Sequence, residues 1–200
     1  MELTFENIEK LIAISDQKLD PWLEERNPLS HPYYRFLYHL VLNFKPKVAV
    51  ELGTSFGRGS AHMCAAAKTY GGQVVGLDVN YHKLAAEELP AKFDKYQFLQ
   101  GDACAEESVN KVQDIVDEYG QIELLYQDSS HHYLKSKEEW RIYRPLTKHG
   151  IWICDDISAP FHDPLVDPPG KGMVQYFDEL PGNKRLYDNL HLGNVQGIII

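Results

Sequence analysis

Acidic residues stand directly after five short apolar segments of the sequence, and their positions could serve chemistry that needs a cation. The acids are Glu51, Asp78, Asp102, Asp128 and the pair Asp155 and Asp156. If the apolar segments are parallel strands, their carboxyl ends share the sheet edge at which ligands of open α/β sheets bind. Carboxylates brought together raise one another's pKa and repel unless positive charge offsets them. The pattern therefore predicts a crevice for a cationic ligand.

The same acids have a structural interpretation, because Asp at a strand-to-helix junction is a common helix N-cap. Capping explains any single acid of the set. It accounts less well for acids at five consecutive junctions, with a doubled acid at the last one. We therefore favour the binding crevice and keep capping as the alternative.

The segment after the first apolar run is rich in glycine and reads Glu-Leu-Gly-Thr-Ser-Phe-Gly-Arg-Gly-Ser from Glu51 to Ser60. Glycines let a backbone turn tightly and let a ligand approach it closely. The dinucleotide fingerprint GxGxxG is absent, because Ser55 stands where its second glycine would be, and no Gly-Lys-Ser/Thr follows. The segment is thus typical of a ligand-binding loop, but a pyrophosphate is not the favoured ligand.

The elements that must position these residues alternate along the chain, as in an α/β protein. Strands are predicted at residues 48–50, 74–77, 96–99, 122–126 and 151–153, with helices near residues 30–45, 60–70, 109–120 and 134–149 between or beside them. Continuous apolar strands joined by crossover helices indicate a doubly wound, mostly parallel sheet with helices on both faces.

The C-terminal part departs from this rhythm. Residues 158–172 hold four prolines and two glycines and are predicted to form a long ordered loop. A helix is expected at 173–180, followed by strands at 184–190 and 195–200 with a turn near Gly193 and Asn194. The sheet should therefore end in an antiparallel hairpin. We expect one domain over 1–200, with a helical segment at 1–45 and the α/β core at 46–200.

Composition narrows the class of protein. The chain has 200 residues, 44% of them hydrophobic, and 20 Lys and Arg against 29 Asp and Glu give a net charge of −9. Disorder, coiled coil and collagen are excluded, and an acidic chain lacks the basic surface of a nucleic-acid binder. Cys64, Cys104 and Cys154 form no CxxC pair, and neither a leader nor a membrane span is recognisable. We expect a cytoplasmic protein without nucleic-acid or membrane partners.

The segment from Glu51 to Gly57 has the form acid-x-Gly-x-x-x-Gly and resembles the first motif of class I S-adenosylmethionine-dependent methyltransferases. The resemblance covers the chain from about residue 33 and implies a Rossmann-like fold. It implies that the glycine loop wraps the methionine part of S-adenosylmethionine, that Asp78 holds the ribose hydroxyls and that Asp102 meets the adenine amino group. The cofactor-binding residues implied in this way are Glu51, Gly53, Thr54, Ser55, Gly57, Gly59, Ser60, Asp78, Asp102 and Asp128.

A narrower resemblance lies in residues 125–133, Leu-Tyr-Gln-Asp-Ser-Ser-His-His-Tyr, followed by Trp-Ile-Cys-Asp-Asp at 152–156. It is similar to the metal-dependent O-methyltransferases that include macrocin O-methyltransferase and the cephalosporin-hydroxylase-like proteins. It implies that Asp128, Asp155 and Asp156 bind Mg²⁺ or another divalent cation, which would acidify and orient a hydroxyl of a small-molecule acceptor. Ser129 departs from the usual glycine of that motif.

The resemblance makes His131 and Asp128 the candidate catalytic residues. His131 is the first choice for the general base, because imidazole titrates near neutral pH and the motif places it beside Asp128. Alternatively, His131 caps a helix or supports a metal ligand, and Asp128 takes the proton. His132 should then point elsewhere.

Two other functions stay open. A module that binds S-adenosylmethionine without catalysis is disfavoured by the intact metal residues, and a nucleotide-dependent oxidoreductase is disfavoured by the glycine spacing. The loop at 158–172 either covers the acceptor pocket, contributing His162 or Asp163, or forms a surface for a second subunit in a homo-oligomer.

Overall fold

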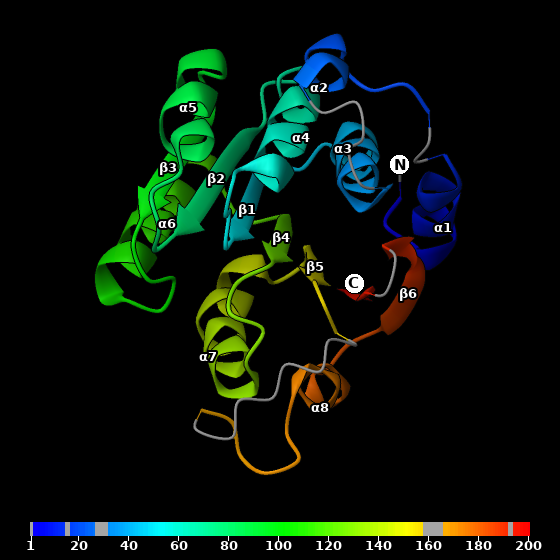
Figure 1. Cartoon of the computed structure of the whole chain (residues 1–200), viewed down its shortest axis with the longest axis vertical. Coiled ribbons are helices and arrows are strands. Elements are labelled where there is room, and N and C mark those ends of the chain that lie inside the picture. Colours follow the sequence, from blue (N-terminus) through cyan, green and yellow to red (C-terminus); the bar gives the residue numbers. More distant parts are fainter. Residues whose placement is uncertain (1, 15–16, 27–31, 158–165, 192–193) are drawn as a thin grey trace.

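The computed structural model describes residues 2–14, 17–26, 32–157, 166–191 and 194–200 (Figure 1). The chain begins with three helices, α1 (Phe5–Ala13), α2 (Pro21–Arg26) and α3 (Pro32–Phe44). Helix α1 starts at Thr4, whose side chain accepts a hydrogen bond of 3.2 Å from the amide of Asn7. Its apolar face, with Ile8 and Leu11 fully buried, packs toward α3.

In the part of the chain that the structure describes, seven strands form one sheet in the order β3-β2-β1-β4-β5-β7-β6. They are β1 (Val48–Leu52), β2 (Gln73–Asp78), β3 (Tyr96–Gln100), β4 (Leu124–Gln127), β5 (Ile151–Cys154), β6 (Lys184–His191) and β7 (Asn194–Ile199). The first five pair in parallel, whereas β7 is antiparallel to β5 and β6 is antiparallel to β7. Because β2 and β4 lie on opposite sides of β1, the chain reverses direction across the sheet there, which is where α/β folds bind ligands.

Helices cover both faces of the sheet, and the central strands β1, β4 and β5 are buried at every position. The remaining helices are α4 (Arg58–Ala67), a π-helix at Leu84–Glu88, α5 (Leu89–Lys92), α6 (Glu106–Tyr119), α7 (Tyr133–Tyr143), a 3₁₀ turn at Arg144–Thr147 and α8 (Met173–Glu179). One core cluster joins α1 to α5 to one face, and the other joins α6, α7 and α8 to the opposite face. Figure 1 shows α3 and α4 on one side of the strands, with α7 and α8 on the other.

The predicted fold class is confirmed, including the terminal antiparallel strands. The π-helix and α5, which connect β2 to β3, were not predicted. The turn expected near Gly193 falls partly outside the described residues. Within the described part of the chain, no helix is both long enough and apolar enough to cross a membrane.

Candidate active site

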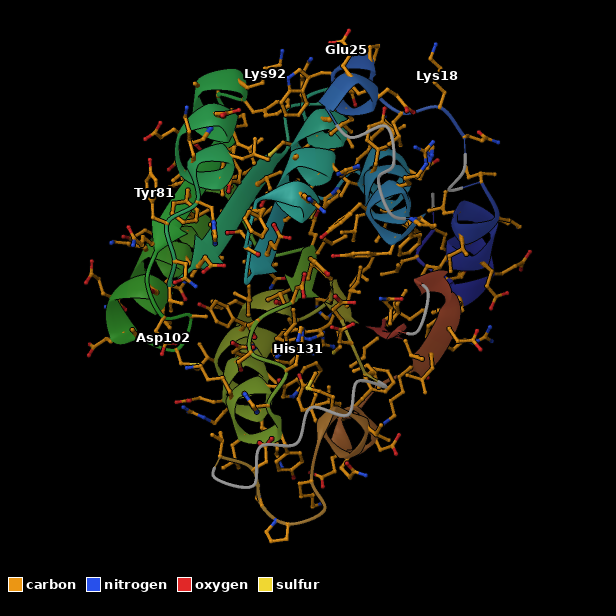
Figure 2. All side chains as sticks on the ribbon, in the orientation of Figure 1. Lys18, Glu25, Tyr81, Lys92, Asp102 and His131 are labelled. Carbon is orange, nitrogen blue, oxygen red and sulfur yellow. The ribbon has the colours of Figure 1, made fainter. Side chains whose placement is uncertain are left out.

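A cavity of about 330 Å³ lies at the carboxyl ends of the parallel strands, a volume suited to a small molecule. Five of the residues predicted to bind a cofactor line it: Gly53, Ser55, Asp78, Asp102 and Asp128. Figure 2 shows Asp102 beside α6 and His131 near α7. The common sheet edge therefore brings these acids together, as the sequence predicts.

The glycine loop approaches the end of β4 so closely that a side chain could not fit at Gly53. Its φ of +87° is in the left-handed region, and an added Cβ would lie 2.2 Å from the carbonyl oxygen of Asp128. Ser55 also has a positive φ, of 44°, and lies in the cavity wall. Such conformations cost free energy and tend to occur at functional sites.

Asp78, the last residue of β2, binds the glycine loop that follows β1. Its Oδ2 accepts a hydrogen bond of 2.7 Å from the amide of Ser55, and its Oδ1 accepts one of 2.8 Å from the amide of Asn80. Both oxygens are therefore fixed at the cavity wall, and each keeps lone pairs for a further donor. This geometry suits an acceptor for ligand hydroxyls.

Asp102 is held by a residue that the sequence analysis did not select. Lys135 of α7 donates a hydrogen bond of 2.7 Å to its Oδ1, and the amide of Cys104 donates another of 2.8 Å to the same atom. The Lys135 ammonium, together with the Cys104 amide, lowers the pKa of Asp102. Because Oδ1 of Asp102 already accepts two hydrogen bonds, a ligand amino group would donate to Oδ2 of Asp102.

The capping interpretation of these acids is wrong for the helices that follow them. The N-cap residues are Gly57 for α4, Ala105 for α6 and His132 for α7, and none of them makes a side-chain capping bond. Asp78 and Asp102 instead accept bonds from amides two residues further on, as in an Asx turn.

Glu51 and its neighbours lie behind the loop rather than in the cavity wall. Glu51 is buried, and its Oε2 accepts a short hydrogen bond from the Ser60 hydroxyl. An added Cβ at Gly59 would lie 2.0 Å from Oε1 of Glu51, so this position has room only for glycine. Burial raises the pKa of Glu51 despite the Ser60 bond. Glu51, Ser60 and Gly59 therefore pack together behind the loop, Thr54 is a buried residue of the loop itself, and Gly57 is the N-cap of α4.

Asp128, His131 and Asp155 form a compact cluster beside the cavity. One ligand atom from each lies within 4.8 Å of the other two. His131 Nε2 is 3.2 Å from Oδ1 of Asp128, and Oδ1 of Asp155 accepts a hydrogen bond of 2.6 Å from Gln196. Asp156 is not in this cluster, although its Oδ2 is 3.8 Å from His131 Nδ1. Among the predicted metal ligands, the structure thus brings Asp128 and Asp155 together, with His131 added.

The electrostatics of the cluster favour a cation. Burial, with a contribution from Asp155, raises the pKa of Asp128 to about 7, even though hydrogen bonds with His131 and Tyr126 lower it. Burial alone would lower the pKa of His131, but Asp128, Asp156 and Asp155 raise it overall. A bound cation would relieve the repulsion between the two carboxylates.

The donor set fits a divalent cation. Two carboxylates are the oxygen ligands that Mg²⁺ and Mn²⁺ prefer, and three side chains leave positions for water or a substrate oxygen. His131 and Asp156 both have a positive φ, of 53° and 51°. These two residues also lie next to each other, with Nδ1 of His131 3.8 Å from Oδ2 of Asp156.

Glu139 of α7 is a second residue that the sequence analysis missed. It is fully buried, lines the cavity and accepts hydrogen bonds of 2.7 Å from Gln127 and from Ser129. Burial raises the pKa of Glu139 despite these bonds. Oε1 of Gln127 in turn accepts from Trp152 and Tyr176, at 3.1 and 2.7 Å. This network fixes the residues on either side of Asp128.

The proline-rich loop contacts α7 where the structure describes it. Asp167 is buried and accepts hydrogen bonds from the amide of Leu134 and from Nδ1 of His132, at 3.2 and 3.3 Å. His132 therefore points away from the cluster, as expected. His162 and Asp163 lie outside the described residues.

The sequence pattern of the rhamnosyl O-methyltransferase/CmcI family matches residues 34–164, whereas a search of curated proteins gave no match. This family match covers more than half of the chain.

Solved structures of methyltransferases have the same fold. A caffeoyl-CoA O-methyltransferase candidate from Staphylococcus aureus is 19% identical, with a TM-score of 0.67 over 98% of this chain and 100% of that one. Podospora anserina methyltransferase PaMTH1, bound to SAH, is 16% identical, with a TM-score of 0.61 over 100% and 97%. MycE of the mycinamycin pathway, with Mg and SAH, is 14% identical, with a TM-score of 0.62 over 100% and 60%. The chain belongs to the rhamnosyl O-methyltransferase/CmcI family.

Proposed function

We propose that the protein transfers a methyl group from S-adenosylmethionine to a hydroxyl oxygen of a small molecule, with a divalent cation in the site. One observation carries the proposal. Asp128 is both a wall residue of the cavity and a member of the cluster with His131 and Asp155. A cofactor in the cavity and a cation in the cluster would therefore lie against each other. The complexes of MycE with Mg and SAH support the same pairing.

In this proposal the cavity binds the cofactor. Asp78 accepts hydrogen bonds from the ribose hydroxyls, and Asp102 lies at the adenine end with Lys135 and Glu139. The backbone of Gly53 and Ser55 faces the methionine part, while Glu51, Thr54, Gly57, Gly59 and Ser60 hold that loop in place. The net charge of −9 and the acids at the cavity favour a sulfonium over a neutral ligand.

Asp128 and Asp155 would hold the cation. Asp156 would be the third protein ligand where His131 acts as the base, and His131 would be that ligand where Asp128 takes the proton. A bound divalent cation lowers the pKa of a coordinated alcohol and fixes its oxygen for in-line displacement. His131 is the proposed general base, and Asp128 is the alternative. The new O–C bond forms as the S–C bond breaks, which releases S-adenosylhomocysteine, and the hydroxyl proton passes to a ring nitrogen of His131. Positioning by these residues supplies much of the rate.

The acceptor is proposed to be a small hydroxylated molecule. The structure of MycE in complex with Mg, SAH and mycinamycin VI supports a small-molecule acceptor. We also propose one domain over the whole chain, because a single core cluster contains both Ile8 and Ile198. A cytoplasmic location is supported by the free thiols of Cys64, Cys104 and Cys154. A homo-oligomer is compatible with this proposal.

The test is methyl transfer from labelled S-adenosylmethionine to a panel of macrolides, sugars and phenols with Mg²⁺ present. We expect labelled product from at least one acceptor class, and we expect chelation or Asp155→Asn to abolish it. Product formation that survives both changes would contradict the metal assignment. Binding of the cofactor without transfer to any acceptor would favour a binding module over an enzyme.

A further inference from the structure

The N-terminal helix α3 reaches the proposed metal site through a tyrosine. Side chains alternate between the two faces of a strand, so Leu124, Tyr126 and Asp128 at the end of β4 point to the same face. Leu124 and Tyr126 pack in the cluster that includes α3. Asp128 therefore faces α3, and Tyr33 is the α3 residue beside it.

Two buried hydroxyl groups converge on the Asp128 carboxylate. Tyr33 is 4% exposed and Tyr126 is 0% exposed. The Tyr33 hydroxyl donates to Oδ2 of Asp128 at 3.3 Å and also shares a short hydrogen bond with the Tyr126 hydroxyl. Each hydroxyl has one proton, so one tyrosine donates to the oxygen of the other, and that second tyrosine donates to Asp128. The two tyrosines thus form a hydrogen-bonded chain that ends on Asp128.

The two oxygens of Asp128 therefore have different partners. Oδ2 is held by the tyrosine chain, while Oδ1 faces His131 at 3.2 Å. The carboxylate of Asp128 can rotate about its Cβ–Cγ bond, and this rotation would change which of its oxygens faces Asp155. Donors on Oδ2 restrict that rotation.

We propose that Tyr33 and Tyr126 are positioning residues that set the orientation of Asp128 for cation binding, which makes α3 a part of the metal site. This inference rests on the proposed function, because it concerns the cation assigned there. Residues that hold a metal ligand from behind contribute about 10–100-fold to metal affinity. A purely structural role would predict lower stability with unchanged metal affinity, because buried hydroxyls need partners in any fold.

The test uses Tyr33→Phe and Tyr126→Phe in the full chain, with Mn²⁺ as the probe. Electron paramagnetic resonance of free Mn²⁺ gives the dissociation constant without any acceptor or turnover. The matched control is Tyr70→Phe. The Tyr70 hydroxyl donates to the carbonyl of Pro46, just before β1 and therefore at the amino ends of the strands. A cooperative thermal unfolding transition shows that each variant is folded before its Mn²⁺ affinity is compared with that of the wild type.

We expect Mn²⁺ affinity to fall about 10-fold or more in each single variant and to stay at the wild-type value in Tyr70→Phe. The fold-loss of Mn²⁺ affinity in the double variant should be smaller than the product of the fold-losses in the two single variants, because the two hydroxyls act as one chain. Wild-type affinity in both folded single variants would overturn the inference. Failure of the unmodified protein to bind Mn²⁺ would instead contradict the metal assignment of the proposed function.

Discussion

Gln196 donates a hydrogen bond of 2.6 Å to Oδ1 of Asp155, and this bond joins the terminal hairpin to the acidic cluster. Both side chains are buried, and Gln196 lies on β7, which pairs antiparallel with β5. Strand β7 therefore has a role beyond extending the sheet. It supplies the donor that fixes Asp155 relative to Asp128.

Asp78→Ala should weaken binding of S-adenosylhomocysteine about 10- to 100-fold. The carboxylate is proposed to accept bonds from the ribose, and hydrogen bonds to charged groups contribute about 1.5–3 kcal/mol each. Its loss also releases the amide of Ser55 from its 2.7 Å bond. Calorimetric titration measures the effect, with the exposed Asp114→Ala of α6 as control. Equal affinities in both variants would show that Asp78 does not hold the cofactor.

His131→Gln should lower kcat about 10²- to 10⁴-fold, because a general base contributes by that factor. The pH profile distinguishes the two candidate bases. If His131 takes the proton, the rise of kcat with pH in the wild type should be absent from the variant. A residual rate that keeps the wild-type pH dependence would assign the proton to Asp128 instead.

Glu139→Gln should change the pH dependence of stability. Burial raises the pKa of Glu139 above its ordinary 4.5, so the folded protein binds this proton more tightly than the unfolded chain does. The resulting stabilisation is complete below about pH 4.5 and is lost as the pH rises through the raised pKa. A glutamine has no proton to lose.

The Tm of Glu139→Gln relative to the wild type should therefore increase between about pH 4 and about pH 8. Oε1 of Glu139 is buried without a hydrogen-bond partner among the described residues, although Oε2 has two. A buried polar atom without a partner costs about 1–3 kcal/mol, and each kcal/mol corresponds to about 2–4 °C in a chain of this size. The control is Glu138→Gln, an exposed neighbour on α7. A Tm difference that does not vary with pH would argue that Glu139 has the same pKa in both states.

Gly59→Ala should lower the Tm, because its Cβ would lie 2.0 Å from Oε1 of Glu51. Overpacking of this kind costs about 1–3 kcal/mol, which outweighs the gain of up to about 1 kcal/mol in helix propensity. In a Glu51→Asp background the shorter side chain makes room, so the same substitution should cost less. A Tm equal to that of the wild type in Gly59→Ala would show that Glu51 can move away.

The sheet and its acidic edge could be predicted because both depend on local patterns. Apolar runs define the strands, and an acid directly after a run must lie at the carboxyl edge, as Asp78, Asp102 and Asp128 do. Glu51 differs because β1 continues to Leu52, so Glu51 is inside the strand and its side chain points into the core.

The supporting residues could not be predicted in the same way, because their partners are distant in sequence. Lys135 and Glu139 occupy consecutive turns of α7, and such charges are usually solvated. Tyr33 fits the apolar face of an amphipathic helix, which hides the role of its hydroxyl. Gln196 alone carried a signal, as a polar residue inside the apolar run 195–200.

The central claim is that the cavity binds the methyl donor and that the cluster binds a cation beside it. Calorimetric titration of S-adenosylhomocysteine, with NAD as the control ligand, tests it most directly in metal-free protein and again with Mg²⁺. We expect S-adenosylhomocysteine to bind with a Kd of about 1 μM, equivalent to about −8 kcal/mol, with additional heat from Mg²⁺ and no binding of NAD. Binding of NAD in place of S-adenosylhomocysteine, or of neither ligand, would contradict the account.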